Sequence, residues 1–130
     1  MLSPCGKKLL LILHPRLQRW LQPGGHVEPH DASIVAAARR ELEEECGITH
    51  AELLDPFFDF DIHTIPGSKR EPEHQHFDVR VLLRAHDEIL KVGDGVKQAA
   101  WVALADLPRC TNDKSVLRVA HKLDPHPKSA

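Results

Sequence analysis

Cysteine is scarce in this sequence, and the three residues that occur are far apart. Cys5, Cys46 and Cys110 form no C-x-x-C pair. So few and so scattered cysteines exclude a disulfide framework. We therefore interpret all three as reduced thiols.

Long apolar runs are also missing. The longest, Leu9 to Leu13, is far shorter than the roughly 20 residues that a membrane-spanning helix requires. Residues 1–6 lack the charged and apolar regions of a secretory signal in the right order, because the lysines follow them. We therefore expect no membrane association and a cytoplasmic location.

No strong charge of one sign is present. The formal net charge is −2, and basic and acidic residues are interspersed along the chain. Without a basic field, a stable complex with nucleic acid is not expected, and a small ligand is favoured. At 130 residues with 42% hydrophobic content, the chain suits one domain over residues 1–130.

Short segments of apolar or alternating character predict a sheet. They are bounded by turn signals, such as the Pro23-Gly24-Gly25 turn and the exposed loop over residues 66–72. The expected strands are Lys7 to His14, Trp20 to Gln22, Phe57 to Ile65, His76 to Ala85 and Gln98 to Val102.

Two segments have helical spacing. The first is Ala32 to Cys46, which Asp31 or Ser33 could cap at its start and Gly47 at its end. Its inward stripe is expected to consist of Val35, Ala38, Leu42 and Cys46. The second helix is Asp113 to Leu123, after which residues 124–130 are expected to be a disordered tail.

The first helix carries the chemistry. Glu41, Glu44 and Glu45 are spaced so that three carboxylates project from one side, away from the apolar stripe. Like charges at this spacing repel each other, and hard oxygen ligands suit Mg²⁺ or Mn²⁺. An isolated E-x-x-E-E pattern, however, is more typical of a solvated acidic face.

The surrounding residues favour the metal site. Gly25 opens a motif whose second half reads Arg40-Glu41-Leu42, Glu44-Glu45 and Gly47-Ile48. This pattern resembles the Nudix box, G-x5-E-x7-R-E-U-x-E-E-x-G-U, where U is aliphatic. Further along, Trp101 to Leu107 is similar to the W-V-P-L-x-E-L segment of that family. The resemblance covers roughly residues 7 to 123.

The resemblance to Nudix hydrolases implies an α/β/α sandwich with a mixed sheet, and Mg²⁺-dependent cleavage of a phosphoanhydride bond. The substrate would be a nucleoside diphosphate linked to another moiety. The resemblance also implies roles for individual residues. Glu44 and Glu45 would be metal ligands, Glu41 a ligand or catalytic carboxylate, and the Gly25 carbonyl a further ligand. Arg40 would orient these carboxylates through ion pairs with Asp31 and with Glu41 or Glu44.

The sequence departs from the family pattern at three places. Asp31 stands in place of the motif glutamate, one residue further from Arg40 than the motif has it. Residues 97–100, directly before Trp101, contain no acid, whereas members of the family commonly have one there. The general base is therefore unassigned, and the candidates are Asp87, Glu88, Asp94, Glu71 and Glu73. Finally, most of the first family strand is lacking, and residues 1–6 would be a remnant that includes a hairpin turn. A homodimer that covers the open edge is expected.

Histidines and arginines outside the motif are candidates for substrate binding. His14 and Arg19 flank the glycine turn, where they could contact phosphates or simply lie in a solvated loop. His74 and His76 share one face of a strand and could line the substrate pocket, although a solvent-facing role is favoured. Trp20 and Trp101 are expected in the core or at its rim, and base stacking is the minority interpretation.

Two other classes of function compete with the hydrolase. One is a Nudix-fold module that binds a nucleotide without cleaving it, which the missing acid and the short N-terminus would favour. The other is a histidine-dependent metal-binding scaffold. It leaves the register of the glutamate motif unexplained, and no zinc ligand set is recognisable.

Overall fold

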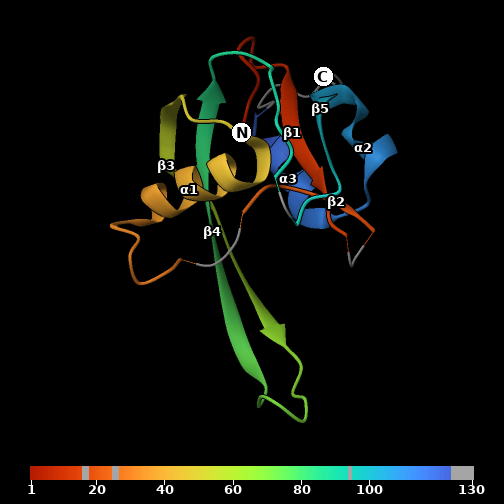
Figure 1. The fold of residues 1–130 in the computed structure, drawn as a ribbon. Helices are drawn as coiled ribbons and strands as arrows, with labels where there is room; N and C mark the ends of the chain where they lie inside the picture. The colour runs from red at the N-terminus through yellow and green to blue at the C-terminus, as the bar shows by residue number, and fades with distance from the viewer. Residues whose placement is uncertain (16–17, 25–26, 94, 124–130) are drawn as a thin grey trace.

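The computed structural model describes residues 1–15, 18–24, 27–93 and 95–123. Gly25 and Asp94, both expected above to be functional, and the expected tail 124–130 lie outside these ranges. The elements follow one another as β1 (Lys8–Leu13), β2 (Trp20–Leu21), α1 (Ile34–Cys46), β3 (Ala51–Ile65), β4 (His74–Ala85), β5 (Gln98–Ala103), η1 (Leu104–Asp106), α2 (Leu107–Cys110) and α3 (Lys114–Leu123) (Figure 1).

Strand β1 is the centre of a three-layer sandwich. It pairs antiparallel with β2 on one side and with β5 on the other. Because side chains alternate along a strand, Leu10 and Ile12 face one layer and Leu9 and Leu11 face the other. All four are 4% exposed or less. Burial on both faces explains why this strand is a continuous apolar run.

Each face of β1 is covered by one of the expected helices. Leu10 and Ile12 pack with Leu42 and Cys46 of α1. Leu9 and Leu11 pack instead with α2 and α3, through Leu107, Val116 and Val119. The α/β/α sandwich expected from the sequence is confirmed. Among the described residues, no helix has the length and apolar character needed to cross a membrane.

The N-terminal residues join the two halves of the sheet. Leu2 forms an antiparallel bridge with Leu9 of β1 and a parallel bridge with Arg84 of β4, so the sheet is mixed. Residues 3–8 form the expected hairpin turn, in which the Gly6 amide donates to the Ser3 carbonyl. Met1 and Leu2 are only 8% and 7% exposed. These two residues fill core positions that the sequence had suggested would be uncovered.

Strands β3 and β4 form a hairpin whose far end projects beyond the rest of the molecule (Figure 1). Strand β3 begins six residues before the expected Phe57, and β4 begins at His74 rather than His76. The early part of β3 contains Pro56, which has no amide to donate to a neighbouring strand. The pairing register shifts on both sides of Asp55, and a proline is tolerated at such an irregularity.

The hairpin has one apolar and one charged face. Phe60 pairs with Val79 and Ile62 with Phe77, whereas Asp59 pairs with Arg80. On the charged face, Asp59 is 6% exposed and accepts hydrogen bonds from Arg80 (3.0 Å), Arg118 (2.8 Å) and Lys122 (3.2 Å). Arg118 and Lys122 belong to α3, so Asp59 fastens the hairpin to that helix.

Replacing Asp59 by Asn is expected to destabilise the protein by about 3 kcal/mol at pH 7, because two arginines and a lysine lose their buried counter-charge. Burial raises the pKa of Asp59, but hydrogen bonds from Arg118 and Lys122 outweigh it and the net pKa is lowered. A lowered pKa stabilises the fold above the unfolded value near 4, and this contribution is lost as the pH falls through the folded value.

Urea unfolding at several pH values tests this expectation. The stability gap between the parent and Asp59→Asn should be present at pH 7 and narrow below about pH 4. Asp61→Asn is the control, since Asp61 is 32% exposed and makes only a 3.5 Å ion pair with Arg118. It should cost less than about 1 kcal/mol. Equal effects of the two substitutions would contradict the role given to Asp59.

Candidate active site

Helix α1 begins and ends at capping residues. The Ser33 hydroxyl accepts a hydrogen bond from the Ala36 amide, so the helix starts at Ile34, two residues after the expected start. Gly47 adopts the left-handed conformation with φ of 70°, and its amide donates to the Glu43 carbonyl. Of the two N-cap candidates, the structure selects Ser33, and the expected cap at Gly47 is confirmed.

The apolar side of α1 determines where its glutamates point. Leu42 and Cys46 are buried, and Ala37 is also buried, although it was not in the expected stripe. Val35 and Ala38 are half-buried. Glu41 and Glu45 are half-buried beside this side and Glu44 is exposed, and the Glu45 side chain reaches the loop before the helix. The Gly24 amide in that loop donates to Glu45 Oε1 at 3.0 Å.

Arg40 connects the loop to the carboxylates. Its guanidinium binds Asp31 through two nitrogens, at 2.9 and 3.0 Å, and donates to Glu41 at 3.0 Å and to Glu44 at 3.2 Å. The Asp31 side chain is 3% exposed and that of Arg40 15%. Asp31 was expected as a partner of Arg40, with Glu41 or Glu44 as alternatives, and the structure shows Arg40 bound to all three. The arginine thus links both glutamates to the loop.

The changed spacing at Asp31 is absorbed by a local turn. The Asp31 amide donates to the Glu28 carbonyl, and the Glu28 amide donates to Asp31 Oδ2 at 2.7 Å. The Arg40 hydrogen bond, followed by that from the Glu28 backbone, lowers the pKa of Asp31 to about 2. This aspartate therefore stays ionised at neutral pH and takes the place of the motif glutamate as counter-charge to Arg40.

The electrostatics at Glu45 reveal an excess of negative charge. Burial raises the pKa of Glu45 to about 7; the Gly24 hydrogen bond opposes this, and the charges of Glu41 and Glu44 add to it. Three carboxylates thus lie close enough to repel one another. A divalent cation would relieve both the burial cost and the repulsion, and carboxylate oxygens are the ligands that Mg²⁺ prefers. The donor chemistry fits the expected metal.

The side chains are not yet arranged as a complete ligand set. Oxygens of Glu41 and Glu44 are engaged with Arg40, and within the described ranges no group of three His, Cys, Asp or Glu side chains converges on a metal position. The Gly25 carbonyl, the remaining expected ligand, lies outside the described residues. Glu41, Glu44 and Glu45 on α1 therefore remain candidate ligands because of their donor chemistry, and their present arrangement does not form a metal site.

A cleft of about 580 Å³ lies beside Glu41. Its wall is formed by the loop before α1, the first half of α1 and strand β4. Sequence reasoning missed its polar residues, since only the fold brings them together. The polar side chains in the lining, besides Glu41, are Gln22, Asp78, Arg80 and Ser115, and the larger apolar ones include Ile34, Phe77, Val79 and Val81.

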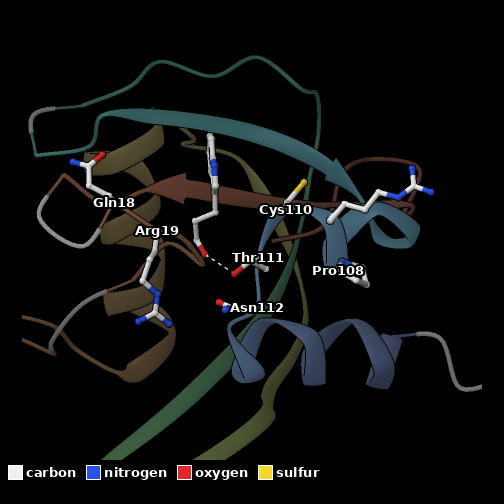
Figure 2. A pocket seen from close by; sticks show the side chains of 8 residues that line it. Gln18, Arg19, Pro108, Cys110, Thr111 and Asn112 are labelled. Carbon is white, nitrogen blue, oxygen red and sulfur yellow. Dashed lines mark hydrogen bonds between the residues drawn. The ribbon is translucent and has the colours of Figure 1, made fainter.

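Two of the expected substrate-binding residues, His14 and Arg19, precede β2 in the chain. Arg19 lines a separate pocket of about 370 Å³ with Trp20, Thr111 and Asn112, and Glu41 is not among its lining residues (Figure 2). Its guanidinium pairs with Asp113 at 2.8 Å. The His14 amide donates to the Arg19 carbonyl, so His14 belongs to the same loop. The structure does not bring Arg19 to the glutamates.

The histidines on β4 are at the projecting end of the hairpin. His74 is exposed, is the first residue of β4, and has its ring Nδ1 3.0 Å from the Pro72 carbonyl. His76 pairs with His63 in the strand register. Figure 1 shows this end of the hairpin pointing away from α1. The structure therefore separates His74 from the glutamate helix.

Four of the five candidates for a general base lie in the described residues, and two of them, Asp87 and Glu88, have partners away from α1. Glu88 pairs with Lys8 at 2.9 Å, and Asp87 accepts a hydrogen bond from the Ile89 amide. Glu71 and Glu73 are exposed in the loop at the far end of the hairpin. Asp94 lies outside the described residues. None of the four described candidates contacts the glutamates of α1 through a hydrogen bond or ion pair found in the structure.

Comparison with known proteins agrees with this geometry. A family model described as NUDIX domain matches residues 2–122. The chain therefore belongs to the Nudix family.

One named relative resembles part of this chain in sequence. A probable DHNTP pyrophosphohydrolase of Lactococcus lactis subsp. cremoris (strain MG1363) is 36% identical over 83 residues, which are 62% of this chain and 49% of the relative. The match thus spans about half the length of that protein.

Solved structures show the same fold. A NUDIX family hydrolase from Clostridium perfringens has a TM-score of 0.69 at 24% identity, covering 97% of this chain and 93% of that one. The E. coli dihydroneopterin triphosphate pyrophosphohydrolase has a TM-score of 0.71 at 15% identity, covering 93% and 88%.

Replacing Arg40 by Lys tests whether its planar group organises the site. Lysine keeps the charge but cannot bind Asp31 through two nitrogens while reaching Glu41 and Glu44. We expect Mn²⁺ binding, followed by electron paramagnetic resonance, to weaken about 10- to 100-fold. Arg39→Lys is the matched control, because Arg39 is exposed and donates to the Ala51 carbonyl instead. Parent-like Mn²⁺ affinity in Arg40→Lys would rule out the organising role.

Proposed function

We propose that this protein is a pyrophosphohydrolase that depends on a divalent cation, with Mg²⁺ preferred and Mn²⁺ accepted. It would cleave a phosphoanhydride bond in a nucleoside diphosphate linked to another moiety. One observation carries the proposal: Arg40 binds Asp31, Glu41 and Glu44 at once, beside a half-buried Glu45 whose pKa is raised to about 7. Carboxylates held together in this way repel one another, which destabilises the fold but favours the binding of a cation.

The proposed mechanism assigns one task to each group. Glu41, Glu44 and Glu45, with the Gly25 carbonyl, would hold the metal, which when bound neutralises phosphoryl charge and lowers the pKa of an attacking water. Glu41 lines the cleft and is the carboxylate on α1 that meets the substrate. Arg40 does not contact the substrate; it keeps the carboxylates oriented. Positioning and electrostatics supply the rate enhancement.

The cleft suggests the class of substrate. Phe77 and Val79 give β4 an apolar surface, and Gln22 and Arg80 add polar groups nearby. A flat heteroaromatic ring joined to a di- or triphosphate fits such a lining. The relatives whose names specify dihydroneopterin triphosphate point in the same direction. We therefore propose pterin or nucleoside triphosphates as the first substrates to test, ahead of sugar nucleotides and dinucleotides.

A nucleotide-binding module without hydrolysis is the second candidate. The segment Gln98–Ala100 before Trp101 contains no acid. Among the described candidates for a base, Asp87 and Glu88 are engaged elsewhere, and Glu71 and Glu73 are exposed at the far end of the hairpin. This alternative predicts ligand binding with no turnover, and the following experiment separates the two.

Diphosphate and triphosphate compounds are to be screened with Mg²⁺ or Mn²⁺ while phosphate and nucleotide release is followed. The parent should show turnover that chelation of the metal abolishes. Glu44→Gln and Glu45→Gln should each reduce kcat by about 100-fold or more, since each removes a charged metal ligand. Glu43→Gln is the matched control, because Glu43 is an exposed neighbour at a variable position of the motif, and it should keep parent activity.

Two results would contradict the hydrolase. Equal background in the parent and all three variants, combined with nucleotide binding, would support the binding module. Equal losses in Glu43→Gln and Glu44→Gln would show that charge on the helix matters in general and that the proposed ligands are not special.

We also propose a cytoplasmic homodimer. Met1 and Leu2 occupy the place that a dimer was expected to cover, so the support for self-association comes instead from exposed apolar side chains of the hairpin such as Phe57 and Phe60. Light scattering at micromolar concentration should give the mass of two chains. A monomeric mass would contradict the dimer and leave the proposed activity untouched.

A further inference from the structure

The loop between β4 and β5 lies directly against the end of the glutamate helix. The Lys91 amide donates to the Cys46 carbonyl at 2.9 Å, and the Gly93 amide donates to the Glu45 carbonyl at 3.0 Å. Both acceptors are in the last turn of α1, whose carbonyls have no partner within the helix itself. The loop therefore supplies donors that the end of the helix lacks.

This last turn needs external support. It contains Glu43, Glu44 and Glu45, and no basic residue. The C-terminal end of a helix carries partial negative charge, so anionic side chains there are unfavourable. The last turn, which holds the proposed ligands Glu44 and Glu45, is consequently destabilised by its own charges. The hydrogen bonds from the Gly47 cap and from the loop oppose its fraying.

Because Gly93 has no side chain, the loop can lie against the last turn of α1. A Cβ at this position would lie 1.8 Å from the Glu44 carbonyl oxygen and 3.0 Å from the Glu44 carbonyl carbon. These are backbone atoms, which cannot rotate away as a flexible side chain would. The end of α1 has a glycine in a similar position: a Cβ on Gly47 would lie 2.8 Å from Lys91 Cβ. Each segment thus presents a glycine where the other comes closest.

The loop is also held on both flanks, so it cannot simply withdraw. Before the contact, the Glu88 carbonyl accepts a hydrogen bond from Trp101 Nε1 at 3.0 Å, and Glu88 pairs with Lys8. After it, the Lys97 amide donates to the Leu13 carbonyl at 3.2 Å. A side chain at position 93 would therefore press on the last turn of α1 between two anchored ends.

We propose that Gly93 is a positioning residue, which sets the place of the Glu44 and Glu45 carboxylates through the backbone of the last turn of α1. It contacts neither the substrate nor the metal. The inference rests on the proposed function for its catalytic consequence, but the structural claim about the last turn stands independently of it.

Gly93→Ala tests the proposal, with Gly95→Ala as the matched control. Gly95 is in the same loop and has a φ of +82°, so alanine strains the backbone there, but its Cβ would meet nothing within 4 Å. Gly93→Ala should weaken Mn²⁺ binding, measured by electron paramagnetic resonance with the metal alone, by about tenfold or more. It should also lower kcat while KM changes little. Gly95→Ala should retain parent affinity for Mn²⁺ within about threefold.

Hydrogen–deuterium exchange supplies a readout that does not depend on metal. In Gly93→Ala, amides of the last turn of α1 should exchange about tenfold faster than in the parent, while those of its first turn stay unchanged. If the parent neither binds Mn²⁺ nor turns over any substrate, the proposed function fails, and the exchange result alone judges the positioning role.

Two outcomes would overturn the inference. One is a folded Gly93→Ala protein with parent-like Mn²⁺ affinity and parent-like exchange in the last turn. The other is a Gly95→Ala protein impaired as strongly as Gly93→Ala. If Gly93→Ala does not fold, Lys91→Pro is used as the test in its place. This substitution removes the amide that donates to the Cys46 carbonyl and adds no side chain at position 93. Parent-like exchange at the end of α1 in that variant would overturn the proposal.

Discussion

The ion pair between Arg40 and Asp31 is the interaction on which the rest of the candidate site depends. Two parallel hydrogen bonds join a guanidinium that is 15% exposed to a carboxylate that is 3% exposed. Removing one partner of so buried a pair leaves an uncompensated charge, so the two segments that carry them must stay together. The loop before α1 is thereby fastened to the middle of the helix, and the remaining donors of Arg40 are aimed at Glu41 and Glu44.

Backbone groups then complete what the arginine begins. On one side the Gly24 amide binds the Glu45 carboxylate, and on the other the Gly93 amide binds the Glu45 carbonyl. Three glutamates near the negative end of a helix repel one another and the helix dipole. Amide donors from two separate loops offset part of this cost without adding positive side chains. The arrangement keeps the site anionic, as binding of a divalent cation requires.

The fold supplies the platform for this arrangement. Strand β1 is buried on both faces, and α1 packs on one of them through Leu42 and Cys46. This packing fixes the direction of the glutamate side of the helix. The β3–β4 hairpin forms part of the cleft wall and is held to α3 by Asp59. The cleft therefore lies between two layers, with Glu41 and the first half of α1 on one wall and β4 on the other.

Local patterns in the sequence were sufficient for the two longer helices and for the cap at Gly47, because each depends on residues close along the chain or on a periodicity that hydrophobic burial imposes. The sandwich and the partners of Arg40 were expected from the resemblance to the Nudix family, and only the structure chose Ser33 over Asp31 as the N-cap. Local patterns were insufficient for the early start of β3, because an irregular ladder accommodates Pro56 in a way that only strand pairing reveals.

Only the tertiary structure shows which residues from distant segments of the chain lie close together. Met1 and Leu2 fill the core beside β1, Arg19 faces a pocket away from the glutamates, and His74 lies at the far end of the hairpin. The contact between Gly93 and Glu44 joins residues that no spacing rule relates. The sequence by itself determined which groups could carry the chemistry, since charge and periodicity are local properties. Only the folded chain decided which of them meet, because that depends on how the layers pack.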